Sequence, residues 1–73
     1  MDIKNFKLIK NRQRPEQCFA YEKKTNNAKY SIFTMNGGKT YLASIEGKRM
    51  DGSFYPKKSN TVSNIDEALA FLA

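Results

Sequence analysis

The sequence predicts an α+β fold: an antiparallel four- to five-stranded sheet, built as a meander of hairpins, with one short C-terminal helix packed on one face. Two observations support this prediction. Turn-forming Gly, Asn and Asp residues recur at short, hairpin-like intervals over most of the chain, and the last ten residues change to a helical period. A small barrel with a terminal helix is the alternative arrangement.

The chain length allows one domain over residues 1–73 and no internal linker, because 73 residues cannot build two separate cores. A domain of this size buries only about 60% of the surface that its unfolded chain exposes. We therefore expect modest stability unless the protein dimerises or binds a ligand.

Turn signals divide the strand-forming part of the chain. Asn36-Gly37-Gly38 is the strongest of them, and Asp51-Gly52 has a type I′-like character. Asn26-Asn27 predicts another turn, and Pro15 closes a loop that begins at Asn11. The predicted strands cover residues 3–10, 18–24, 30–35 and 40–45, the last of which ends at Glu46-Gly47, and a further hairpin covers 48–50 and 53–55.

The C-terminal segment has the pattern of an amphipathic helix. Asn64 can cap the helix, and Glu67 follows three residues later in a capping-box arrangement. Apolar residues then recur with helical spacing at Ile65, Ala68, Leu69 and Leu72. A helix of about two turns is unstable alone, so we expect it to dock on the sheet.

Hairpin register decides which side chains share a face. Two-residue turns at Asn26-Asn27 and Gly37-Gly38 would pair Tyr21 with Ile32, and Ile32 with Ala43. A three-residue loop would instead turn one strand over. The predicted tyrosine face carries Phe19, Tyr21, Lys23, Tyr30, Ile32, Thr34, Tyr41, Ala43 and Ile45, and the opposite face carries Cys18, Ala20, Glu22, Ser31, Phe33, Met35, Thr40, Leu42 and Ser44.

One short helix cannot cover both faces, so one face is left open or is covered by a second subunit or the terminal strands. Tyrosine hydroxyls favour a wet edge, whereas Phe33, Met35 and Leu42 beside small serines suit close helix packing. We therefore expect the helix on the opposite face and the tyrosine face exposed. The alternative is that the tyrosines belong to the core, because Ile32 and Ile45 share their face.

The charge of the chain is strongly basic and unevenly distributed. Thirteen Lys and Arg against seven Asp and Glu give a net charge of +6. Asp66 and Glu67 lie in the last ten residues, so residues 1–64 carry thirteen bases and five acids, a net of +8. Such a field attracts polyanions, although excess lysine also serves solubility alone.

Exposed tyrosine rings edged by lysines are typical of surfaces that bind single-stranded nucleic acid, because bases stack on the rings and ammonium groups contact phosphates. Residues 48–58 add a basic, aromatic hairpin suited to a phosphate backbone, or simply a solvated hairpin. The predicted nucleic-acid-binding residues are Tyr21, Tyr30, Tyr41, Lys23, Lys39, Lys48, Arg49, Tyr55, Lys57 and Lys58.

Signals for catalysis are poor, so we do not expect an enzyme. The chain has no His and one cysteine, Cys18, which rules out an intrachain disulfide and a zinc site built from Cys. Lys39-Thr40 opens a strand and lacks the spacing of a phosphate-binding loop. We expect no metal or cofactor.

The N-terminal ten residues interrupt their apolar positions with lysines, so we expect no membrane insertion and a cytoplasmic location.

These observations predict a small basic nucleic-acid-binding protein that favours single-stranded DNA or RNA and has low base specificity. The alternative is a small protein-interaction or inhibitor module, of the kind that mobile elements carry, docking on an acidic protein surface. Exposed sheet edges make a homodimer plausible in either case.

Overall fold

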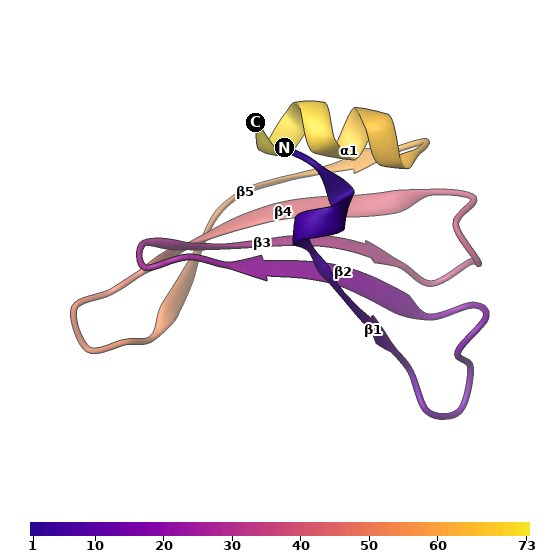
Figure 1. Ribbon diagram of the computed structural model, residues 1–73, viewed down its shortest axis with the longest axis horizontal. Coiled ribbons are helices and arrows are strands. Elements are labelled where there is room, and N and C mark those ends of the chain that lie inside the picture. The colour runs from indigo at the N-terminus through magenta and orange to yellow at the C-terminus, as the bar shows by residue number, and fades with distance from the viewer.

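Five antiparallel strands form a single sheet in sequence order, and one helix follows them (Figure 1). The computed structural model describes residues 1–73, and the α+β meander with a C-terminal helix is confirmed. Its elements are η1 (Ile3–Asn5, a 3-10 turn), β1 (Lys7–Lys10), β2 (Phe19–Lys24), β3 (Ala28–Thr34), β4 (Tyr41–Lys48), β5 (Phe54–Val62) and α1 (Ile65–Leu72).

The predicted register of the central strands is confirmed. Tyr21 lies opposite Ile32, and Ile32 lies opposite Ala43. The turn between β2 and β3 is held by the Thr25 hydroxyl, which accepts hydrogen bonds from the backbone N–H groups of Asn27 and Ala28 at 3.3 and 3.0 Å. No residue other than glycine has positive φ, so this turn does not use the left-handed conformation that asparagine tolerates.

The β3–β4 turn is stabilised by side chains around two glycines. Gly37 and Gly38 have φ of 72° and 93°, which residues with a Cβ rarely adopt. The buried Thr34 hydroxyl donates to the Asn36 Oδ1 at 2.8 Å and accepts from the Gly38 N–H at 3.0 Å. Asn36 also binds Thr40 through its amide. These bonds close the turn at the register that the sequence predicts.

The strand predicted at 30–35 is Ala28–Thr34, and other element boundaries differ more strongly from the sequence prediction. Residues 3–6 do not extend β1, because Asp2 caps the η1 turn by accepting from the Lys4 N–H at 3.0 Å. Glu46-Gly47 does not end β4, which continues to Lys48. The Tyr55 ring lies across Gly47 so closely that a Cβ there would be 2.5 Å from the tyrosine Cζ. Because Gly47 has no side chain, the Tyr55 ring of the neighbouring strand can lie directly over its backbone.

The last hairpin joins the longest strands of the sheet. Residues 48–50 and 53–55, predicted as a separate hairpin, instead form the junction of β4 and β5: β4 ends at Lys48, β5 begins at Phe54, and residues 49–53 form the turn between them. β5 runs on to Val62 and carries a register shift opposite Ile45 and Glu46. Pro56 and the lysines that follow it concealed this strand in the sequence, because proline is depleted in strand interiors.

The C-terminal helix begins and ends as predicted. The Asn64 side chain accepts from the Glu67 N–H at 2.9 Å, and the Glu67 carboxylate accepts from the Ser63 N–H at 3.0 Å. In this capping box the Glu67 carboxylate thus binds the N–H of Ser63, the residue before the cap, rather than that of Asn64 itself. Ala68 and Leu72 are buried against the sheet.

The prediction that the helix covers Phe33, Met35 and Leu42 is wrong, because α1 packs on the tyrosine face. The buried core joins residues of that face to the helix and to Phe6, and Tyr21, Tyr30 and Tyr41 pack around it. Two alanines lie at the centre and let the backbones approach closely, while the tyrosines occupy the margin. The core residues are Phe6, Ile32, Ala43, Val62, Ala68 and Leu72.

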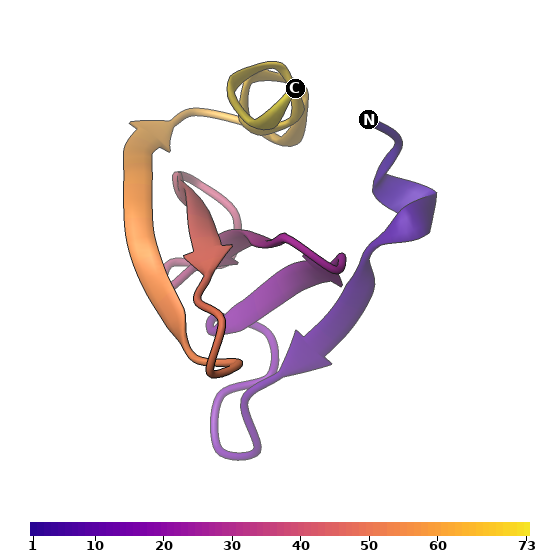
Figure 2. The same cartoon turned by 90° about the vertical axis from the view of Figure 1, so that its left-hand side faces the viewer.

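The sheet curls so that the tyrosine face is concave, and α1 lies across part of it (Figure 2). The helix packs mainly on β4, with fewer contacts to β5 and β3. The part of the concave face over β1 and β2 lies beside η1 rather than beneath the helix. The opposite face is convex and open.

Two leucine substitutions test which face carries the core. Leu72 is 3% exposed and Leu42 is 42% exposed. We expect Leu72→Ala to lower the free energy of unfolding by about 2–5 kcal/mol through lost burial and a cavity, and Leu42→Ala to change it by no more than about 0.5 kcal/mol. Urea denaturation followed by circular dichroism measures both. Equal losses would contradict the arrangement of the helix.

Candidate functional site

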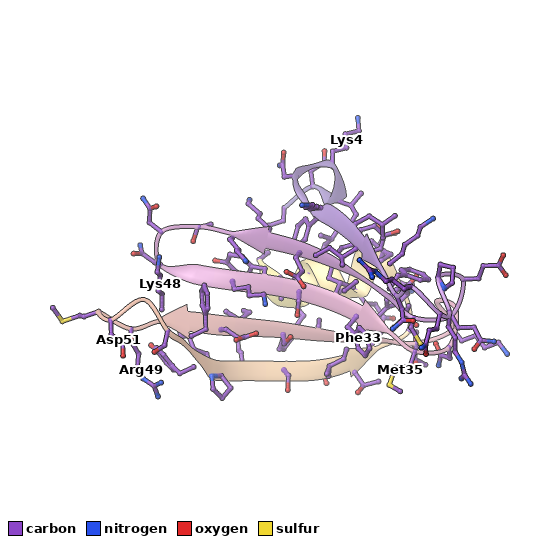
Figure 3. All side chains as sticks on the ribbon, turned by 90° about the horizontal axis from the view of Figure 1, so that it is seen from below. Lys4, Phe33, Met35, Lys48, Arg49 and Asp51 are labelled. Carbon is purple, nitrogen blue, oxygen red and sulfur yellow. The ribbon has the colours of Figure 1, made fainter.

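Basic side chains gather where two hairpins meet. The backbone N–H of Lys48 donates to the Asn27 carbonyl at 3.1 Å, which ties the β4–β5 hairpin to the β2–β3 turn. Figure 3 shows Lys48, Arg49 and Asp51 at this end of the sheet, and Phe33 and Met35 toward the other end. We call this region the basic end, and its bases are Lys23, Lys24, Lys29, Lys48, Arg49, Lys57 and Lys58.

Most of these charges have no acidic partner. The one ion pair in the structure joins Lys29 Nζ to Glu22 Oε1 at 3.8 Å. The seven bases of the basic end are accompanied by three acids, Glu22, Glu46 and Asp51, for a net charge of +4. The remaining six bases and four acids give a net of +2. The excess positive charge is therefore concentrated at one end of the molecule.

Two aromatic rings of β5 support cations at this end. Arg49 Cζ lies 5.3 Å from the centroid of Tyr55, and Lys29 Nζ lies 6.0 Å from the centroid of Phe54. Such contacts hold a cation over a ring without neutralising its charge. The rings thus position both cations. Arg49 keeps its charge available to an anion, whereas Lys29 also forms the ion pair with Glu22.

The hairpin tip is held by its own side chains. Arg49 N–H donates to the Ser53 carbonyl at 2.7 Å, and the Asp51 carboxylate accepts from the Ser53 N–H and hydroxyl at 2.9 and 2.6 Å. These hydrogen bonds lower the pKa of Asp51, and the bond from the Ser53 hydroxyl has the largest effect. The turn therefore presents Lys48 and Arg49 from a defined backbone.

The sequence-predicted site residues fall into two groups. Lys23, Lys48, Arg49, Tyr55, Lys57 and Lys58 come together at the basic end. Tyr21, Tyr30 and Tyr41 are half-buried around the core beside α1, so they do not form an open row. Lys39 lies in the β3–β4 turn, away from the basic end.

Part of the tyrosine face forms an open hollow over β1 and β2. Leu8 lies opposite Tyr21, and Lys10 lies opposite Phe19. The sequence did not indicate that Leu8 and Lys10 belong to this face, because the register of β1 depends on the conformation of the long 11–18 loop. The residues that line the hollow are Leu8, Lys10, Pro15, Glu16, Phe19, Tyr21 and Gly37.

The convex opposite face carries an apolar patch. Ile9, Phe33, Met35 and Leu42 are the large hydrophobic residues exposed on it, and Met35 is 70% exposed. Ser31 and Ser44 lie next to this patch with their hydroxyl oxygens 2.7 Å apart. A clustered apolar surface of this kind is typical of protein interaction sites.

The phenol of Tyr41 gives a test of the packing around the core. Its burial, and secondarily the charge of Tyr21, raises the pKa of Tyr41 above the usual 10.0. The unfolded chain therefore ionises first as pH rises, and the stabilisation present below pH 10.0 is lost progressively above it. We expect the melting temperature to fall from about pH 10 upward, and Tyr41→Phe to lessen that fall. An identical fall in both proteins would contradict this assignment.

No three Cys, Asp or Glu side chains lie close enough to share a metal ion, and the chain has no His. The structure contains no helix of the length and apolarity needed to cross a membrane. In comparisons with known proteins, no family model, no curated protein and no solved structure matches this chain.

Proposed function

We propose that the protein binds nucleic acid and that its basic end contacts the phosphate backbone. The observation that supports this proposal is the gathering of seven bases, with a single ion pair among them, where two hairpins meet. Unpaired ammonium and guanidinium groups at such density attract a polyanion and release its counterions on contact.

Phosphate contact is assigned to the exposed bases of the hairpins. Lys48 ends β4 and Arg49 begins the β4–β5 turn, and Lys57 and Lys58 follow on β5. Arg49 is held over Tyr55 at 5.3 Å, so Tyr55 serves as a platform for the guanidinium rather than as a stacking surface for a base. Lys24 extends the same surface from the neighbouring hairpin, and Lys29 lies opposite it within the pair that it forms with Glu22.

Low base specificity follows from these groups. Lysine ammonium groups bind phosphate oxygens whatever base is attached, and phosphate contacts carry no direct sequence information. Nearly all of the charge at the basic end comes from lysine, with Arg49 as the single guanidinium. Affinity at this end is therefore expected to depend on salt more than on sequence.

A second candidate function is protein interaction, which the apolar patch of Ile9, Phe33, Met35 and Leu42 favours. An interaction or inhibitor module could place this patch on a partner while the basic end meets acidic groups of the same protein. We propose the same patch for a homodimer, since its four large hydrophobic side chains are exposed on the face that α1 leaves open.

The salt dependence of binding tests the role of the basic end. We expect wild-type protein to bind a single-stranded DNA oligonucleotide with an affinity that falls steeply with salt. The double variant Lys24→Gln/Lys48→Gln removes two proposed phosphate contacts, so the slope of log K against log salt should become shallower by about 1.4. Fluorescence anisotropy over a salt series measures it.

The matched control is Lys4→Gln/Lys39→Gln, which removes the same charge from outside the basic end. We expect it to change the slope little. Equal effects of the two double variants would contradict a localised site, and absence of oligonucleotide binding at low salt would remove the proposed function.

The apolar patch gives a separate prediction for the second candidate. Leu42→Glu places a charge on the convex face without disturbing the core, because Leu42 is exposed. We expect oligonucleotide affinity to stay within about twofold, since one added charge outside the basic end alters phosphate contact little. If the patch forms a dimer, sedimentation of wild-type protein will depend on concentration and that of Leu42→Glu will not. A monomer at all concentrations excludes the homodimer.

A further inference from the structure

The hollow over β1 and β2 is the part of the tyrosine face that α1 leaves uncovered. The helix packs on β4, β5 and β3, and the concave face continues past it to Tyr21, Phe19 and Leu8. Leu8 is 44% exposed and lies directly opposite Tyr21. An aromatic and aliphatic surface is therefore accessible beside the core.

The two rings that line the hollow contact each other, and a third ring, that of Tyr41, lies close by at Gly38. Phe19 and Tyr21 meet edge to face, with centroids 6.1 Å apart and planes at 88°. Tyr41 and Phe19 both approach Gly38, where a Cβ would lie 2.6 Å from the Tyr41 hydroxyl and 4.0 Å from Phe19. Because Gly38 has no side chain, these rings can fill the space at the β3–β4 turn.

The rim of the hollow carries one base and one acid. Lys10 lies opposite Phe19 on β1, and Glu16 lines the hollow from the 11–18 loop. A phosphate beside Lys10 is attracted, whereas one beside Glu16 is repelled. An anionic polymer is thus expected to run along the Lys10 side while an uncharged planar group enters the hollow.

We propose that this hollow holds one unstacked base of a single-stranded nucleic acid, with the neighbouring phosphate at Lys10. The inference rests on the proposed function and specifies its substrate class. A base in a duplex is stacked and paired and cannot lie on these rings without being extruded, whereas a base in a single strand is free to do so. The basic end supplies phosphate contact, and the hollow supplies the preference for single strands.

Two adjacent tryptophan substitutions test the proposal directly. The chain has no Trp, and Leu8 and Ile9 are 44% and 42% exposed on opposite faces of β1. We expect the fluorescence of Leu8→Trp to be quenched when a single-stranded DNA oligonucleotide binds, because a base stacks on the indole. The matched control Ile9→Trp reports from the convex face and should change little. Quenching in Ile9→Trp but not in Leu8→Trp would overturn the proposal.

Removal of the Tyr21 ring supplies a second measurement. We expect Tyr21→Leu to weaken binding by about 5- to 100-fold at an unchanged salt slope, and Tyr21→Phe, which keeps the ring, to retain most of the affinity. Thermal melting verifies that both variants fold. If Tyr21→Leu binds like wild type while Lys24→Gln/Lys48→Gln does not, the hollow is excluded and the proposed function stands.

Duplex DNA of the same sequence completes the test. We expect it to bind more weakly than the single strand at equal salt and to leave the fluorescence of Leu8→Trp unquenched. Equal affinity for duplex and single strand, with no quenching by either, would overturn the base site. Absence of binding to both at low salt would instead remove the proposed function.

Discussion

The close packing of α1 against β4 is the interaction on which the rest of the structure depends. Ala43 of β4 and Ala68 of α1 are both fully buried, and their small side chains let the helix approach the sheet. This contact decides that the tyrosine face is the concave, core-bearing face, and it leaves the convex face to solvent. The tyrosines lie at the margin of the core, where their rings are partly buried and their hydroxyls can reach water.

The fold was predictable because its turns and its helix are encoded locally. The Asn36-Gly37-Gly38 turn and the Asn64 cap are formed by residues within a few positions of one another, and the register between them follows from parity. The face chosen by the helix was not predictable in the same way. It depends on Phe6 and Val62, which join the core from outside the central strands, and neither belonged to a strand that the sequence indicated clearly.

The candidate site divides along the same line. The basic hairpin is contiguous in sequence, so the concentration of Lys48, Arg49, Lys57 and Lys58 was visible before the structure. The hollow is assembled from β1, β2, the 11–18 loop and Gly37 of the β3–β4 turn. Its composition depends on the register of β1, which a loop of that length leaves undetermined. Local sequence patterns thus predict where the basic side chains gather. The hollow proposed for a base, in contrast, can be identified only from the curved sheet of the structure.

The outer edge of β5 has a consequence for self-association. A strand at the border of a sheet exposes unpaired backbone groups on which further copies of a chain can polymerise. Here Pro56 removes a donor, and the register shift beside Glu46 interrupts the regular ladder where Lys57 lies. The part of β5 next to the β4–β5 turn is therefore a poor template for a cross-β fibre. The charged side chains of Lys57 and Lys58 on this edge strand also oppose pairing with another copy, so the lysines proposed to hold phosphate discourage aggregation as well.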